Sequence, residues 1–197
     1  MAYYTGYVSV PHSTYNEWRN ATLGNFYNVD GVYGSQCWDL ASLFWWNIGF
    51  PQNYPVLIGL DAYTMWNRRN ENASYAGVTY FDLITNVADI KRGDIIVFNY
   101  TSYNTAGHVG FADVDYASWV PDPNQPYEFP ILSENNGGTV DPQGGSSTNI
   151  HGYDIRLFLG VFRYKAWETT PPGPTPTVTR SQFPWFLIAR KLRNRRI

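Results

Sequence analysis

The chain of 197 residues has little sulfur and little charge. It contains one cysteine, two methionines and three histidines, and only 15% of its residues are charged. A single cysteine excludes an intrachain disulfide framework and a metal site built from several cysteines. No apolar run is long enough to span a bilayer, and the first residues lack the basic and apolar regions of a signal peptide. We therefore expect one domain with a sizeable core and no classical secretion signal.

The charges that are present are distributed unevenly along the chain. Residues 169–197 hold six of the 14 basic residues and none of the 16 acidic residues. A Pro/Thr-rich linker over 169–178 is expected to separate a body, residues 1–168, from an aromatic and basic tail over 179–197. The tail is expected either to contact an anionic polymer or membrane, or to dock its aromatic side chains on the body. No nucleic-acid partner is expected.

The only cysteine lies in the most distinctive stretch of the chain. After Cys37, apolar residues recur at helical spacing: Leu40, Ala41, Phe44 and Trp45. This pattern predicts a mostly buried helix with Cys37 in its first turn and Ser35 as its N-cap. Free backbone N–H groups and the helix dipole at that position stabilise a thiolate, which would lower the pKa of the thiol. The alternative is a buried, unreactive cysteine.

A nucleophilic cysteine needs a base, and a third group that holds the base. His108 begins a predicted strand over residues 108–114, which follows a short buried strand over 95–98. Glu134 and Asn136 are two residues apart at the end of a third strand, so strand alternation predicts that both side chains share one face. Either Glu134, as a carboxylate, or Asn136, as an amide, is expected to lie within reach of the imidazole and orient it. The alternative role for Asn136 is to polarise the substrate.

Four further side chains are candidates for substrate contacts. Gln36 is a weak candidate for an oxyanion donor beside the backbone N–H of Cys37. Trp38, Tyr63 and Trp66 are candidate walls of a substrate groove, and packing in the core is the alternative for Tyr63 and Trp66. The sequence also predicts a short helix from Ala62 to Asn67.

The residues before the cysteine have the spacing of a calcium-binding loop. Asn28 and Asp30 offer side-chain oxygens, Val32 and Gly34 offer backbone carbonyls, and Asp39 offers a carboxylate. The position of the glycine and the final acid depart from the EF-hand pattern, and an asparagine at the first position removes one negative charge. The alternative is a loop in which Asn28 and Asp30 cap their own backbone.

Five separated motifs occur in a familiar order, and they lie at residues 36–40, 91–98, 107–110, 134–136 and 160–163. Together they resemble the CHAP family (cysteine, histidine-dependent amidohydrolase/peptidase) over about residues 15–165. The resemblance implies an α+β, papain-like fold, in which N-terminal helices include a cysteine-bearing helix packed on an antiparallel β-sheet.

The resemblance also implies roles for individual residues. Cys37 is implied as the nucleophile, His108 as the base and Glu134 as the residue that orients His108, and Asn136 completes the site. Some phage-lysin members bind calcium in the loop before the cysteine, which implies a structural Ca²⁺ ion held by Asn28, Asp30, Val32, Gly34 and Asp39. No organic cofactor is implied.

We therefore expect a peptidoglycan hydrolase of the phage endolysin or virion-associated type. It would cleave either the N-acetylmuramoyl-L-alanine amide or a peptide bond of the stem peptide or cross-bridge. Such a protein is made in the host cytoplasm and acts on the cell wall, released by a holin or delivered by the virion. The alternative is a catalytically inactive module that binds the wall or forms part of the virion.

Overall fold

The computed structural model describes residues 1–50, 61–69 and 80–168, so the predicted linker and tail lie outside the described residues. The strands are β1 (Tyr3–Thr5), β2 (Phe26–Asn28), β3 (Phe81–Ile84), β4 (Ile95–Phe98), β5 (His108–Ala112), β6 (Glu128–Ser133), β7 (Asn149–Asp154) and β8 (Phe158–Tyr164). The helices are α1 (Tyr15–Thr22), α2 (Cys37–Asn47), α3 (Thr64–Asn67) and α4 (Lys165–Glu168). Within these ranges, no helix combines the length and apolarity needed to cross a membrane.

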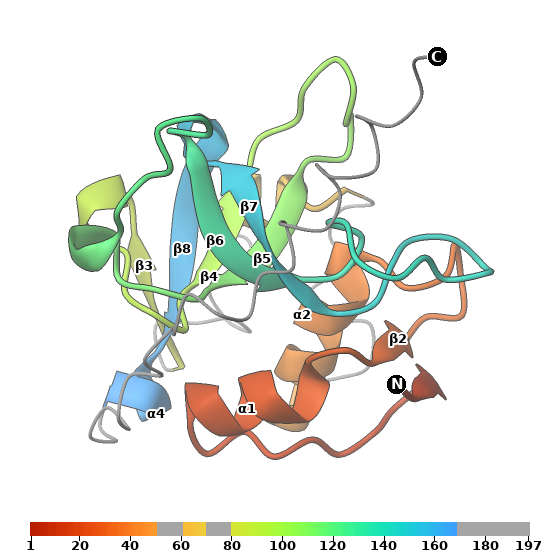
Figure 1. The fold of residues 1–197 in the computed structure, drawn as a ribbon. Coiled ribbons are helices and arrows are strands. Elements are labelled where there is room, and N and C mark those ends of the chain that lie inside the picture. Colours follow the sequence, from red (N-terminus) through yellow and green to blue (C-terminus); the bar gives the residue numbers. More distant parts are fainter. Residues whose placement is uncertain (51–60, 70–79, 169–197) are drawn as a thin grey trace, which may run out of the picture.

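Six strands form one antiparallel sheet in the order β3-β8-β4-β5-β6-β7, whereas β1 and β2 form a separate parallel pair. The predicted β4–β5 hairpin is present, with Phe98 opposite His108. β6 lies antiparallel beside β5, as expected for the strand that ends near Glu134. The sheet and its flanking helices confirm the expected α+β, papain-like class (Figure 1).

Helix α2 packs against β5 and β2, and α1 lies on the same side of the sheet (Figure 1). Four side chains of α2 are at most 1% exposed and join the same core cluster as Val109 and Phe111 of β5: Leu40, Leu43, Phe44 and Trp45. Such nearly complete burial of large side chains is the main stabilising contribution to the position of the helix. The cysteine at its first residue is thereby held against the sheet.

The opposite face of the sheet is also buried. A second cluster contains Ile96 and Phe98 of β4, Ala112 of β5, and Phe129 and Ile131 of β6. Because both faces are covered, β4 and β5 are buried at every position and read as continuous apolar runs. Alternation along β5 therefore turns Val109 toward α2, whereas its neighbour His108 lies on the side of Phe98.

Several elements differ from the sequence-based expectation. The sequence predicts a loop over 139–152 and one strand over 153–164, but Asn149–Asp154 forms β7, which pairs with β6, and a 3₁₀ turn at Ile155–Leu157 separates it from β8. His151 thus lies on a strand rather than in a loop. The short strands β1, β2 and β3 were not expected, and α3 begins at Thr64 rather than at Ala62.

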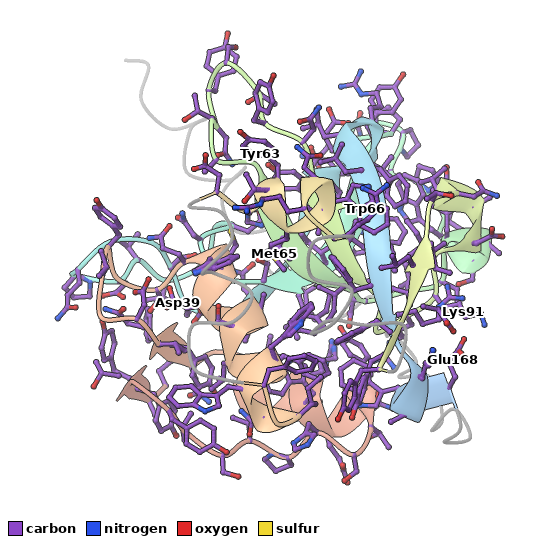
Figure 2. The ribbon with its side chains drawn as sticks, turned by 180° about the vertical axis from the view of Figure 1, so that it is seen from behind. Asp39, Tyr63, Met65, Trp66, Lys91 and Glu168 are labelled. Atoms are coloured by element: carbon purple, nitrogen blue, oxygen red, sulfur yellow. The ribbon has the colours of Figure 1, made fainter. Side chains whose placement is uncertain are left out.

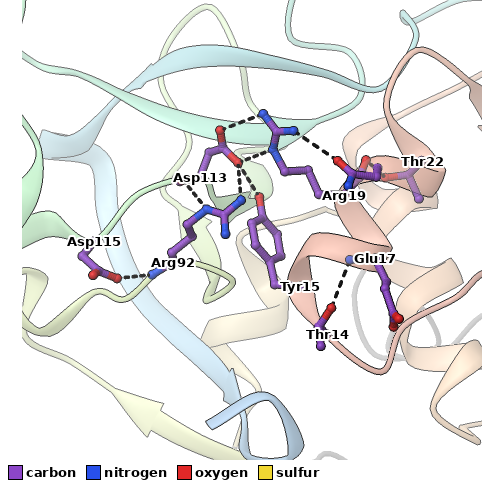
Figure 3. A network of polar contacts seen from close by, with 9 residues as sticks. Thr14, Tyr15, Glu17, Arg19, Thr22, Arg92, Asp113 and Asp115 are labelled. Carbon is purple, nitrogen blue, oxygen red and sulfur yellow. Dashed lines mark hydrogen bonds and ion pairs between the residues drawn. The ribbon is translucent and has the colours of Figure 1, made fainter. Parts of the chain in front are cut away.

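A polar network attaches α1 to the end of β5 (Figure 3). The carboxylate of Asp113 accepts hydrogen bonds from the Tyr15 hydroxyl at 3.0 Å and from Arg19 Nε at 2.7 Å. Arg92 donates its Nε to the carbonyl of Asp113 and places its guanidinium 4.7 Å from the centre of the Tyr15 ring. Asp113 therefore connects α1, the end of β5 and the turn that contains Arg92, which are distant in sequence.

Candidate active site

Cys37 is the first residue of α2, as the apolar spacing predicts, but the cap before it differs from the prediction. Gln36 occupies the N-cap, and its backbone N–H donates to Asp39 Oδ2 at 3.0 Å. Ser35 was the expected cap. Its backbone N–H and its hydroxyl instead both donate to Asp141 Oδ2, at 2.9 and 2.8 Å. The loop that contains Asp141 therefore fixes the chain two residues before Cys37.

Cys37 is buried, with 9% of the residue exposed. Burial raises its pKa to about 12, and hydrogen bonding from the backbones of Val109 and Trp38 offsets this only in part. The expected lowering of the thiol pKa at the helix N-terminus is thus not found, because the loss of hydration outweighs these backbone hydrogen bonds. The thiol is neutral in this structure, and a base must remove its proton before it can attack.

His108, the candidate base, is 2% exposed at the start of β5. Burial lowers its pKa to about 3, so the imidazole is neutral and able to accept a proton. Among the described residues, Nε2 of this ring has no hydrogen-bond partner, and no hydrogen bond joins the ring to Cys37. Catalytic hydrogen bonds are often long or poorly aligned without substrate. The role of His108 stays a prediction.

Glu134 follows the last residue of β6 and is completely buried. Its Oε1 accepts hydrogen bonds from the backbone N–H of Tyr27 at 2.7 Å and from the Thr148 hydroxyl at 3.2 Å. Its Oε2 has no partner in the described part of the chain, and burial raises the pKa of this carboxyl well above its ordinary value. The expected hydrogen bond to His108 is not made in this structure. Glu134 instead connects β6 to β2 on the side of Cys37, whose pKa its charge raises.

Asn136 does not share a strand face with Glu134, because β6 ends at Ser133 and the chain then turns. Asn135 has φ of +53°, in the left-handed region that asparagine tolerates better than most residues. Its Nδ2 donates to Gln36 Oε1 at 2.6 Å, so the turn contacts the residue next to Cys37. Asn136 is half-buried, and its Nδ2 has no partner within the described ranges. Sequence reasoning gave Asn135 no role.

The remaining substrate candidates occupy different environments. Gln36 donates Nε2 to the carbonyl of Tyr33 at 2.7 Å, so this amide is engaged at both ends. Trp38 is half-buried beside Cys37. Tyr63 is half-buried and packs over Gly107, the residue before His108.

Trp66 differs from the expectation for a groove wall. It is 5% exposed and fills the space above Gly160 on β8, with its ring 5.5 Å from that of Phe162. Figure 2 shows Tyr63 and Trp66 at the short helix α3, with Trp66 on the side of β8. Trp66 is therefore a core residue, and Tyr63 and Trp38 remain the candidates that a substrate can reach.

The five candidate calcium ligands lie in and around the loop between β2 and α2. Asn28 is 1% exposed, and its Oδ1 has no partner among the described residues. Asp39 accepts the N–H groups of Val29 and Asp30 with Oδ1, at 2.7 and 3.3 Å. Burial, and next the charge of Asp30, raise the pKa of Asp39 to about 7. Asp30 Oδ1 accepts the N–H of Val32 at 2.7 Å, the local cap that was the alternative interpretation.

The other two candidates differ in exposure: Val32 is exposed, and Gly34 is buried against the loop of Gly144. Within the described ranges there is no group of three or more His, Cys, Asp and Glu residues arranged to hold a metal. The donor set for a cation is thus two carboxylates, one unpaired amide oxygen and backbone carbonyls. Oxygen donors of this kind suit calcium.

A buried helix that begins with a cysteine and packs on an antiparallel sheet, one strand of which begins with a histidine, defines an α+β fold of the papain-like class. A protein-family model described as the CHAP domain matches residues 26–126, just over half of the chain. The chain belongs to the CHAP family.

Known proteins that are similar to this chain include a phage endopeptidase and an endolysin. The D-alanyl-L-alanine endopeptidase of Streptococcus phage B30 is 32% identical over 104 residues, which cover 52% of this chain but 22% of that protein. The chain thus spans about a fifth of the length of this curated relative. The crystal structure of a wild-type endolysin, LysIME-EF1, matches with a TM-score of 0.53 and 22% identity, covering 78% of this chain and 66% of that one. At that identity the likeness concerns the fold.

Proposed function

We propose that this chain is a peptidoglycan hydrolase of the phage lysin type that uses Cys37 as its nucleophile. The observation that supports this most is the placement of the only cysteine at the first residue of α2, against the start of the strand that His108 begins. Membership of the CHAP family and similarity to a phage endopeptidase support the same class of reaction.

The chemistry follows from the neutral state of both groups. His108 takes the thiol proton as the sulfur attacks an amide carbonyl, and the resulting imidazolium then protonates the leaving amine as the C–N bond breaks. Water, deprotonated by the same imidazole, hydrolyses the thioester. The backbone N–H of Cys37 lies at the helix start, where a developing oxyanion is stabilised. In the substrate complex, Glu134 Oε2 and Asn136 are the groups left to orient the imidazole.

The nucleophile assignment is tested on purified cell walls. Cys37→Ala and His108→Ala are expected to leave a folded protein with no clearing of turbidity. His151→Ala is the matched control, because His151 is exposed on β7, and it should clear walls as the wild type does. Full activity of Cys37→Ala would contradict the assignment.

The bond that is cut is proposed from the similarity to the phage endopeptidase. On this basis the enzyme hydrolyses a peptide bond of the stem peptide or cross-bridge rather than the N-acetylmuramoyl-L-alanine amide. Mass spectrometry of digested muropeptides distinguishes the two, because an endopeptidase leaves the first alanine attached to the muramic acid. Release of intact stem peptides would instead assign amidase activity.

An inactive wall-binding or virion module is the second candidate function. The observation that favours it is the absence, among the described residues, of a hydrogen bond joining His108 to Cys37 or to Glu134. This candidate predicts that the wild type binds walls in a pull-down assay but never clears them. Clearing that depends on Cys37 would eliminate it.

A structural calcium ion is part of the proposal. Two observations support a cation among these residues: the unpaired Oδ1 of Asn28, and the repulsion between the carboxylates of Asp30 and Asp39. The carbonyls of Val32 and Gly34 complete the donor set.

Calcium should raise the melting temperature and EDTA should reverse the increase. Asp30→Asn should abolish the response. Asp122→Asn, which alters an exposed loop carboxylate with the same local cap, should not. An unchanged melting temperature with calcium would reject the site.

The basic tail, residues 179–197, is proposed to bind an anionic wall polymer or membrane, since it carries all six basic residues of 169–197 and no acid. Deleting it should weaken sedimentation with anionic vesicles or teichoic-acid-bearing walls, and salt should weaken the binding of the full chain. Equal binding and lysis by the two forms would contradict this proposal.

A further inference from the structure

Tyr153 of β7 lies face to face with His108. The two ring centroids are 4.4 Å apart and the ring planes differ by 11°, whereas Phe98 contacts Tyr153 at 4.6 Å on the same side of the sheet. β7 is not adjacent to β5 in the sheet, since β6 lies between them. The tyrosine therefore reaches His108 from a strand whose position is set by other contacts.

We propose that Tyr153 is a positioning residue for His108, which fixes the plane of the imidazole and stabilises the imidazolium that forms when the Cys37 proton is transferred. The inference rests on the proposed function, in which His108 is the base. An aromatic face attracts a cation placed over it, and this attraction is strongest where water is excluded. Neutral imidazole gains less from the same contact, so the stabilisation grows as the proton arrives.

A hydrogen-bonded loop also links the two stacked residues. Asn104 Nδ2 lies 3.4 Å from the Tyr153 hydroxyl and also donates to the carbonyl of Gly107 at 2.9 Å. Gly107 directly precedes His108, and its φ of +70° is a conformation that favours glycine. A Cβ at Gly107 would collide with the carbonyl of Phe98 and with Tyr63. The backbone of His108 and the ring that covers its side chain are thus joined through one asparagine.

The stack also limits where the imidazole can turn. One face of the ring is covered by Tyr153, and Nε2 has no hydrogen-bond partner among the described residues. Without other polar contacts on that nitrogen, aromatic packing is the contact that holds the ring orientation. The aromatic ring of Tyr153, rather than its hydroxyl, is therefore the group that orients His108.

Three variants test the proposal on soluble muropeptides. Tyr153→Leu removes the ring and should lower kcat about tenfold with little change in KM. Tyr153→Phe retains the ring and should keep kcat within about twofold of the wild type. Tyr116→Leu is the matched control, because Tyr116 packs on Phe129 beside the same core cluster, and it should retain full kcat. Equal kcat for Tyr153→Leu and the wild type would overturn the proposal.

Alkylation of Cys37 by iodoacetamide at one fixed pH gives a second measurement that needs no wall substrate. The chain has no other cysteine, so the rate reports on this thiol alone. Loss of positioning should slow alkylation in Tyr153→Leu, whereas mere loosening of the fold would expose the thiol and speed it. Slower alkylation in a protein that clears no walls would refute the proposed function but retain the positioning role. An alkylation rate equal to that of the wild type, or faster, would refute the positioning role itself.

Discussion

Cys37 and His108 are both shielded from water, and burial shifts their pKa values in opposite directions. Each shift favours the neutral form of its group, which makes a preformed thiolate–imidazolium pair unfavourable. The two neutral groups suit a mechanism in which proton transfer accompanies attack, and substrate binding is expected to bring them into alignment. The proposed mechanism depends on precise side-chain placement, which is why residues that contact neither reacting atom matter.

Asp141 is one such residue, and its ionisation gives a pH-dependent prediction. Burial opposes its ionisation, but hydrogen bonds from Gln143 and Ser35 outweigh burial and lower its pKa. A lowered pKa stabilises the fold above the unfolded value of about 3.9, and this contribution is lost as the pH falls through the lower, folded value. Asp141→Asn should therefore reduce the free energy of unfolding at pH 7 by about 1–3 kcal/mol.

The difference between the wild type and Asp141→Asn should begin to shrink below about pH 4, where the carboxyl of the unfolded chain becomes protonated, and should vanish once the pH has fallen through the lower pKa of the folded protein. Urea unfolding of both proteins between pH 3 and pH 7 measures it. A difference independent of pH would show that the charge of Asp141 contributes nothing.

At the scale of elements, the loop over residues 139–148 crosses the segment that leads into α2. Ser35 and Gly145 form an isolated bridge, and Gly34 lies under the carbonyl of Gly144. No side chain fits at either crossing. The start of α2 is therefore held by a loop that comes more than 100 residues later in the chain.

Gly145→Ala tests this crossing. The added Cβ would overlap the carbonyl oxygen of Ser35, and φ of +75° adds backbone strain. We expect a loss of more than about 3 kcal/mol in the free energy of unfolding and reduced wall clearing, since Ser35 must move. Gly24→Ala is the control: φ is +81° but nothing lies within 4 Å of the new Cβ, so strain alone should cost about 1–2 kcal/mol. Equal losses in the two variants would contradict the close crossing.

The elements with strong local signals could be predicted from the sequence. Helical spacing after Cys37 and the β-branched run at Ile95 both lead to the observed α2 and β4. β7 gave no such signal, because Asn149, Gly152 and Asp154 are rare in strands and only pairing with β6 makes the segment extended. Tertiary contacts of this kind cannot be read from local pattern.

The candidate site shows the same division. The positions of Cys37 and His108 at the starts of their elements follow from the sequence, whereas the partners of Glu134 do not. The prediction that Glu134 and Asn136 share one strand face was wrong, because Asn135 adopts a left-handed conformation and the strand has already ended. Ser35 was mistaken for the cap because its preferred partner, Asp141, lies in a loop whose position is set by the fold. Burial of the thiol likewise depends on the whole core.

At the scale of the molecule, Asp113 joins α1, β5 and the turn that contains Arg92 (Figure 3). Its side chain is 14% exposed and that of Arg19 is 18% exposed, so the ion pair is partly shielded from water. Removing one member leaves the others without their partner in a poorly hydrated place.

Asp113→Ala should therefore lower the free energy of unfolding by about 2–4 kcal/mol, as measured by thermal or urea unfolding. Asp82→Ala is the matched control, because Asp82 pairs with Lys165 at 3.3 Å where both side chains are well exposed, and it should cost less than about 1 kcal/mol. Wall clearing at low temperature should survive in both variants. Comparable destabilisation by the two changes would contradict the anchoring role of Asp113.

The solitary, enclosed thiol of Cys37 has a consequence for oxidative damage. A sulfenic acid formed there would meet no second cysteine of this chain with which to form a reversible disulfide, so continued exposure to peroxide would carry it on to the sulfinic acid. Limited access, rather than repair, is what protects the sulfur. Variants that loosen the packing around α2 should therefore lose activity faster than the wild type during storage in air, because the thiol becomes more accessible to oxidants.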